Sequence, residues 1–169
     1  PPGLGSHVSW DTKLDAMLAG LLMSIPAIKA VEIGDGVRNS ELPGSRVHDE
    51  IFYNNQQGIY RQTNRAGGIE GGISNGETIW ARCYMKPIPT LYKPLRSVDT
   101  RLWQEEKAAV ERSDICAVPA AAVVGEAMMS FGIARAFLHK FSGDHLDQVR
   151  DAFAGYQKYM KKVWRWERI

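Results

Sequence analysis

The stretch NRAGGIEGGISNGETIWARCYMKPIPT, residues 64–90, combines a glycine-rich loop, a strand-like run, and a lysine followed by two prolines. Five of its glycines lie within a span of ten residues: Gly67, Gly68, Gly71, Gly72 and Gly76. Glycine loses more backbone freedom on folding than any other residue, so this concentration needs a structural or a functional reason. Tight turns and close approach of the backbone to a ligand are the two usual reasons.

Both explanations of the glycine loop stay open on sequence grounds. A run of glycines can present several backbone N–H groups to one anion or flat ring, because no side chain keeps the ligand away. The loop lacks the Lys-Ser or Lys-Thr ending of a P-loop. It also misses the spacing of the dinucleotide fingerprint and leads into a strand instead of a helix. An irregular structural loop and a ligand-contacting loop are therefore the two interpretations.

Hydrophobic periodicity on both sides of this stretch predicts a mixture of helices and strands. Asp11 is expected to cap a helix that Pro26 ends. Residues 37–46 are expected to form a loop, and the polar residues 54–65 are expected to form a mobile excursion. The prolines of residues 86–95 exclude a central strand there. The expected helices cover residues 10–25, 119–140 and 144–165, and the expected strands cover residues 28–36, 47–54, 78–85 and one or two segments of 97–111.

The composition indicates a globular protein of 169 residues, 44% of them hydrophobic and 24% charged. This length fits one domain, or half of a larger one. A net charge of +2 gives no argument for nucleic acid. Cys83 and Cys116 form no paired motif, which favours a reducing, cytoplasmic setting. The most apolar segment, residues 118–141, is interrupted by Glu126 and Arg135, so no membrane span is expected.

Two short segments carry residues suited to anion chemistry. In KPIPT, Lys86 and Thr90 flank a proline-stiffened turn that can hold a phosphate with little loss of entropy. The alternative interpretation is that Lys86 extends into solvent and binds nothing. In RSDICAVP, Arg112 can clamp an oxyanion and Asp114 can accept a proton, or the two form an exposed pair worth about 0–1 kcal/mol. The four histidines show no metal-ligand spacing, so no metal site is expected.

Several segments together resemble the chorismate synthase family, in the order of that family's motifs and within its C-terminal half. They are PGLGSHV, MSIPAIKAVEIGDG, GSRVHDEI, NRAGGIEGGISNGE, MKPIPTLYKPLRSVD and ERSDICAVPAAAVVGEAM. The resemblance implies an α+β fold in which antiparallel sheets sandwich helices, in a homotetramer. It places residues 1–143 in the C-terminal part of the catalytic domain and residues 144–169 in a variable helical tail. The start PPGLGSHVSW, without methionine, is interpreted as the middle of a longer protein.

The resemblance also implies a reaction. The family eliminates phosphate and a ring hydrogen from 5-enolpyruvylshikimate 3-phosphate to give chorismate, with reduced FMN as cofactor and NADP as an associated nucleotide. Asp114 matches the aspartate thought to help deprotonate the flavin near N5. The matching FMN contacts are Pro26, Ala27, Gly71, Lys86, Pro87, Ile88, Pro89, Thr90 and Arg112. At Pro26 the family usually has a polar residue, so a backbone contact is expected there instead of a side-chain contact.

The family's two catalytic histidines and most of its substrate-binding arginines lie in its N-terminal half. His7 and His48 match neither histidine. The isolated chain is therefore expected to be inactive, although the whole protein is expected to be an enzyme. A non-catalytic FMN-binding or phosphate-binding module and a pure assembly domain are the alternatives, and neither a nucleic acid nor a membrane partner is expected.

Overall fold

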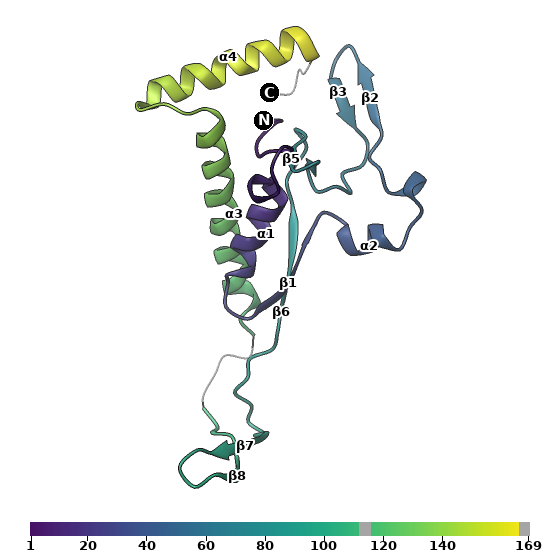
Figure 1. Cartoon of the computed structure of the whole chain (residues 1–169). Helices are drawn as coiled ribbons and strands as arrows, with labels where there is room; N and C mark the ends of the chain where they lie inside the picture. The colour runs from purple at the N-terminus through teal and green to yellow at the C-terminus, as the bar shows by residue number, and fades with distance from the viewer. Residues whose placement is uncertain (112–115, 166–169) are drawn as a thin grey trace.

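The structure is a computed structural model that describes residues 1–111 and 116–165. Helices α1 (Leu14–Met23) and α3 (Val118–Lys140) lie side by side, and a ladder of strands β1 (Ile28–Ile33) and β6 (Ala81–Met85) packs against α1 (Figure 1). Helix α4 (Leu146–Trp164) crosses one end of α3, close to the N-terminus (Figure 1). This mixture of helices and small antiparallel sheets confirms the expected α+β class.

The remaining elements are short and surround the helix pair. Within residues 1–111 and 116–165 the strands form four sheets of two antiparallel strands each, paired as β1–β6, β2–β3, β4–β5 and β7–β8. The short elements are η1 (Trp10–Thr12), α2 (Gly36–Ser40), η2 (Gly44–Arg46), β2 (Ile51–Asn54), β3 (Gly58–Arg61), β4 (Ile69–Glu70), β5 (Ile73–Ser74), β7 (Arg96–Asp99) and β8 (Gln104–Lys107).

The contact between α1 and α3 is close because α3 carries glycine where α1 carries leucine. Leu14, Leu18 and Leu22 recur every fourth residue along α1 and are all buried. At Gly132 of α3, an added Cβ would lie only 2.5 Å from the Leu18 Cδ2 atom. Gly125 faces the end of the same stripe, 3.9 Å from the Leu22 Cδ2 atom. The absent side chains on α3 thus make room for the leucines of α1.

The N-terminal segment is held between the glycine loop and α4. The Gly3 backbone N–H donates to the carbonyl oxygen of Ser74 at 2.7 Å, and Leu4 is 1% exposed. The Tyr156 hydroxyl of α4 donates to the carbonyl oxygen of Pro2 at 2.9 Å. The first and last described segments of the chain therefore contact each other directly.

Helix α4 attaches to α3 through an aromatic cluster. Phe137 and Phe141 at the end of α3 meet Phe153, with ring centroids 5.0 and 5.2 Å away, in edge-to-face contacts. His145 caps α4, accepting a hydrogen bond from the Asp147 backbone N–H. This cluster and cap set the direction of α4 across the end of α3.

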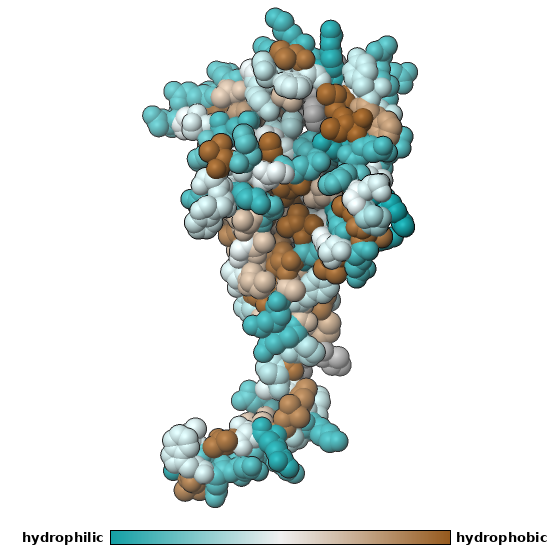
Figure 2. All heavy atoms as spheres, turned by 45° about the vertical axis from the view of Figure 1, so that its right-hand side comes forward, coloured by the Kyte–Doolittle hydropathy of each residue, from teal (hydrophilic) through white to brown (hydrophobic). Residues whose placement is uncertain are grey.

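Much of α3 is exposed, although the helix is apolar. Val123, Phe131 and Leu138 are all more than half exposed. Figure 2 turns the side opposite to α3 forward, and apolar side chains appear over the middle of the body there as well. By length and composition α3 is the one helix of the described chain that is long and apolar enough to cross a membrane, and the core helix of a soluble protein passes the same test. The expectation that the chain contains no membrane span stays a prediction. In this fold α3 is the packing partner of α1.

The structure differs from the sequence expectations at three places. Asp11 does not cap a helix: it lies in η1, and α1 begins at Leu14, whose N–H donates to the carbonyl oxygen of Gly72 at 2.8 Å. Residues 37–46 contain most of α2 and all of η2 instead of a loop. Residues 54–65 contain β3, paired with β2, where a mobile excursion was expected. The strands β1 and β6, the β7–β8 hairpin and the helices α3 and α4 are confirmed.

Candidate functional site

The candidate site starts at Lys86, the residue that follows strand β6. The Lys86 backbone N–H donates to the carbonyl oxygen of Ala27 at 2.9 Å, which extends the β1–β6 pairing beyond Ile28 and Met85. The turn that contains Pro26 and Ala27 therefore lies beside the start of residues 86–90. Two segments that are far apart in the sequence, both predicted to contact the cofactor, are brought together here.

The turn itself has an unusual backbone. Ala27 has a φ of 66°, a left-handed conformation that costs a residue with a side chain about 1–2 kcal/mol. The Ile28 N–H donates to the carbonyl oxygen of Ile25 at 3.1 Å, which closes the turn between α1 and β1. Pro26 is exposed and has no side-chain hydrogen-bonding group. Strained backbone of this kind clusters at ligand sites, and only a backbone contact to a cofactor fits this turn.

The side chains of residues 86–90 suit a phosphate. Lys86, Pro87 and Pro89 are exposed, while Ile88 and Thr90 are half-buried. Lys86 forms no ion pair with any residue in the described part of the chain. The prolines restrict φ, so an oxyanion would meet a cation on a segment that loses little entropy on binding.

Most of the glycine loop turns out to be structural. Added Cβ atoms at Gly67, Gly68 and Gly72 would lie 2.5 to 2.6 Å from backbone atoms of other segments. Glycine is required at these three positions because backbone packs directly on backbone. Gly71, between β4 and β5, is different: it is exposed, and no atom lies within 4 Å of an added Cβ. Of these four glycines, Gly71 is the one open to a ligand.

The predicted contacts do not all meet in the described chain. The glycine loop packs against Gly34 and Trp80, at the Ala81 end of β6, whereas Lys86 follows the opposite end of that strand. Gly71 and Lys86 are therefore separated by the length of the ladder. A cofactor contact at both positions stays a prediction. Arg112 and Asp114 lie outside the described residues.

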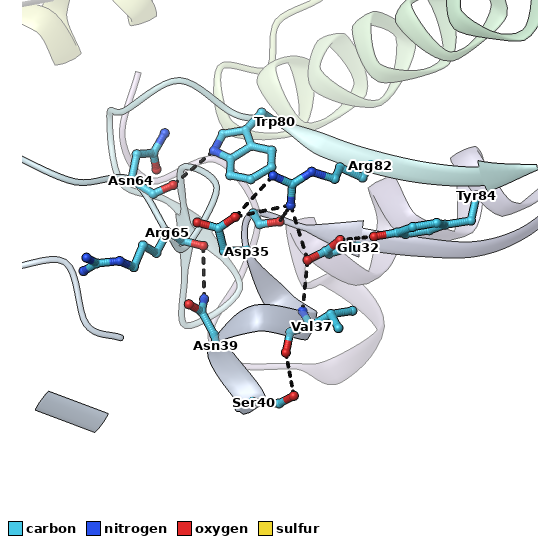
Figure 3. A network of polar contacts seen from close by, with 11 residues as sticks. Glu32, Asp35, Val37, Asn39, Ser40, Asn64, Arg65, Trp80, Arg82 and Tyr84 are labelled. Carbon is cyan, nitrogen blue, oxygen red and sulfur yellow. Dashed lines mark hydrogen bonds and ion pairs between the residues drawn. The ribbon is translucent and has the colours of Figure 1, made fainter. Parts of the chain in front are cut away.

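A polar network on the β1–β6 ladder was not predicted from the sequence (Figure 3). The buried Glu32 accepts hydrogen bonds from the Tyr84 hydroxyl and, at 3.0 Å, from the Val37 backbone N–H. Arg82 forms ion pairs with Glu32 at 3.4 Å and with Asp35 at 3.2 Å. The bond from Tyr84 and then that from Val37 hold the pKa of Glu32 below its ordinary value, and the same bond raises the pKa of Tyr84.

This network fixes α2 on the ladder and keeps the Glu32 carboxylate ionised, so Glu32 is unsuited to donate a proton. The signal in the sequence was the alternation of β1, which places Glu32 on the same side as Ala30. Ile28 instead lies on the core side, because the ladder is irregular between Ile28 and Ala30. A charged residue at such a position needs a partner when it is buried. The partners, Arg82 and Tyr84, alternate along β6 in the same way.

Asp49 anchors the segment that enters the glycine loop. Its buried carboxylate accepts hydrogen bonds from the backbone N–H groups of Arg65 and Ala66, both at 2.9 Å, and from the Thr63 hydroxyl. Burial by itself would raise the pKa of Asp49. The three hydrogen bonds and the charge of Arg65 outweigh burial and hold that pKa below its ordinary value. Asp49 is therefore a structural acceptor.

The fold matches that of a known class of protein. A crystal structure of chorismate synthase superposes with a TM-score of 0.78 and 42% sequence identity, over 96% of this chain and 41% of that chain. The family model described as chorismate synthase matches residues 1–138. The fold and the ordered motifs together define a chorismate synthase-like α+β protein.

Curated relatives give the same family. The chorismate synthase of Syntrophomonas wolfei subsp. wolfei is 70% identical over 169 residues, which are 100% of this chain and 43% of that protein. Those of Desulforamulus reducens and Geobacter sulfurreducens are each 57% identical, over 96% and 95% of this chain and 42% and 43% of the relatives. The chain belongs to the chorismate synthase family. It spans less than half the length of these relatives, and the division at residue 143 stays a prediction.

Proposed function

We propose that this chain is part of a chorismate synthase that converts 5-enolpyruvylshikimate 3-phosphate to chorismate by anti-1,4-elimination of phosphate, with reduced FMN as cofactor. The observation that carries this proposal is the hydrogen bond of 2.9 Å between Lys86 and Ala27. It joins two parts of the predicted FMN site, the turn at Ala27 and the segment that begins at Lys86, which lie far apart in the sequence. The proposed setting is a cytoplasmic homotetramer.

The proposed roles follow from the chemistry of each segment. The chemistry that bound reduced FMN supplies is a transient donation of an electron, without net redox change. Lys86 and the proline-stiffened residues that follow hold the FMN phosphate. The backbone of Ala27 orients the cofactor beside them. By resemblance, Arg112 meets oxyanion charge and Asp114 accepts the proton near flavin N5.

We also propose that the chain does not turn over substrate alone. It spans 43% of the length of its S. wolfei relative, and the family's catalytic histidines belong to the part that does not match. Incubation of the isolated chain with reduced FMN and 5-enolpyruvylshikimate 3-phosphate should give no chorismate. Formation of chorismate under these conditions would contradict the proposed inactivity.

Flavin binding tests the site without requiring turnover. FMN reduced with dithionite is titrated anaerobically into the chain and followed by calorimetry. Replacing Lys86 by glutamine should weaken binding about tenfold, since a hydrogen bond to a charged group is worth about 1.5–3 kcal/mol. Lys93→Gln, an exposed lysine nearby, is the matched control. Equal effects of the two variants, or no saturable binding, would argue against the site.

The exposed face of α3 favours a second candidate, an assembly module. Val123 and Phe131 are 68% and 60% exposed on this helix, and apolar surface of this kind is typical of contacts between chains. If the chain self-associates in analytical ultracentrifugation but binds no reduced FMN, the assembly role replaces the flavin site. Binding of FMN with an affinity that depends on Lys86 favours the enzyme part.

A further inference from the structure

A polar cleft lies beside α2, and its lining residues differ from those assigned to FMN. It encloses about 370 Å³ and is lined from three separate pieces of chain, with Arg38 from α2, Arg46 from η2 and Arg65 from the entry to the glycine loop. His48 and Glu50 complete its charged or titratable lining. None of these residues is among the predicted cofactor contacts.

The charge of this cleft is not balanced. Within residues 1–111 and 116–165, Arg38, Arg46 and Arg65 form no ion pair, although the charge of Arg65 helps to lower the pKa of Asp49 behind the cleft. Figure 3 shows the Arg65 side chain pointing away from the network of Asp35 and Arg82. A concave site lined mainly by one sign of charge concentrates counter-ions. The cleft is therefore electrostatically suited to an anion.

The backbone that carries these arginines is fixed. The Arg65 carbonyl oxygen accepts hydrogen bonds from the Asp35 N–H at 2.8 Å and from the Asn39 side chain at 3.2 Å, while its N–H donates to Asp49. The Arg46 N–H donates to the carbonyl oxygen of Pro43 at 2.8 Å. Positions held in this way are preorganised, so that ordering of side chains is the main entropy loss on binding.

Asn39 supplies a second and different indication. Its Nδ2 atom donates to the Arg65 carbonyl oxygen, which fixes the orientation of the amide. Its Oδ1 atom is then buried without a hydrogen-bond partner, in a side chain that also lines the cleft. A buried acceptor without a partner is costly. A ligand that brings a hydroxyl donor as well as oxyanions would use both Asn39 and the arginines.

We propose that the cleft formed by Arg38, Arg46, Arg65 and Asn39 binds a small anion that carries two or more oxyanion groups and at least one hydroxyl. The oxyanions are carboxylates or a phosphate ester, because both fit the planar fork of guanidinium groups. The hydroxyl donates to the Asn39 Oδ1 atom. This site is additional to the proposed flavin site and does not depend on it.

Calorimetry with three probes tests the proposal on the 169-residue chain. Malate and succinate differ by one hydroxyl, and 3-phosphoglycerate adds a phosphate ester to a hydroxylated carboxylate. Malate should bind more tightly than succinate, by about fivefold, because only malate satisfies the Asn39 acceptor. Tighter binding of 3-phosphoglycerate than of malate would identify a phosphate ester as the preferred oxyanion, and the reverse order would identify a carboxylate.

Variants locate the binding. Arg46→Gln and Arg65→Gln should each weaken malate binding about tenfold, and Asn39→Ala should remove the preference for malate over succinate. Arg101→Gln, in the exposed turn between β7 and β8, should leave both affinities unchanged, and circular dichroism confirms that each variant is folded. The proposal is overturned if no probe binds saturably at 10 mM, or if Arg46→Gln, itself exposed and far from the core, has no greater effect than Arg101→Gln.

Discussion

Replacement of Gly34 by alanine would test whether the glycine loop is fixed by direct packing of backbone on backbone. Gly34 has a φ of +59°, and an added Cβ would lie 2.2 Å from the carbonyl oxygen of Arg65 and 2.5 Å from the amide nitrogen of Gly67. Both neighbours are backbone atoms. The Gly34 N–H also donates to the carbonyl oxygen of Trp80 at 3.1 Å. The segment at Gly34 therefore cannot move away from its neighbours without losing this hydrogen bond.

The expected loss of stability is the sum of three terms. The left-handed conformation costs alanine about 1–2 kcal/mol, overpacking costs about 1–3 kcal/mol, and a broken hydrogen bond costs about 1 kcal/mol. Gly34→Ala should therefore lower the free energy of unfolding by about 3–6 kcal/mol. At about 2–4 °C per kcal/mol for a chain of this length, the melting temperature should fall by roughly 6–24 °C.

Gly71→Ala is the matched control. Gly71 has almost the same φ, +60°, but no atom lies within 4 Å of an added Cβ, so only the conformational cost of about 1–2 kcal/mol applies. Urea unfolding followed by circular dichroism measures both variants. If Gly34→Ala loses no more stability than Gly71→Ala, the backbone contact does not contribute and the reasoning fails.

Two further predictions concern Asp49 and the contact between α1 and α3. Because the pKa of Asp49 lies below its ordinary value of 3.8, its stabilising contribution is present above that pH and is lost as the pH falls through the folded pKa. Urea unfolding should show Asp49→Asn less stable by about 1–2 kcal/mol at pH 7, and this difference should shrink as the pH falls below 3.8. Gly125→Ala should raise the melting temperature through helix propensity worth up to about 1 kcal/mol, since its Cβ would have no neighbour closer than 3.9 Å, whereas Gly132→Ala should lower it by crowding Leu18 at 2.5 Å. Equal shifts in the two glycine variants, or a pH-independent effect of Asp49→Asn, would contradict these expectations.

The elements that the sequence predicted are those with a strong local period. The stripe of leucines gives α1, and the alternation of β1 and β6 gives the ladder. The start of α1 was misplaced because a tertiary hydrogen bond, from Leu14 to Gly72, decides it. Strand β2 falls within the strand expected at residues 47–54, but its partner β3 was missed because it lies in a polar stretch without a clear period. Phe52 and Tyr60 stack across the two strands with ring centroids 5.7 Å apart, a contact that appears only once the strands pair.

Part of the candidate site was equally open to prediction. The proline-stiffened cation at Lys86 is visible in the sequence, but its bond to Ala27 depends on the register of the β1–β6 ladder. The purpose of the glycines was left undecided between packing and ligand contact. The structure assigns Gly67, Gly68 and Gly72 to packing because their Cβ positions are occupied by other backbone segments. Composition alone does not carry that information.

The position of the β7–β8 hairpin has a consequence for the integrity of the chain. The hairpin stands clear of the body, at the end opposite the N-terminus (Figure 1), and two strands alone are marginally stable in water. A protease that cleaves after basic residues should therefore cut first at exposed sites such as Arg101 or Lys107. The two pieces would stay joined as one particle, because α1 packs on α3 and Tyr156 is bonded to Pro2 at 2.9 Å. The hairpin is thus a natural place at which to open the chain for circular permutation.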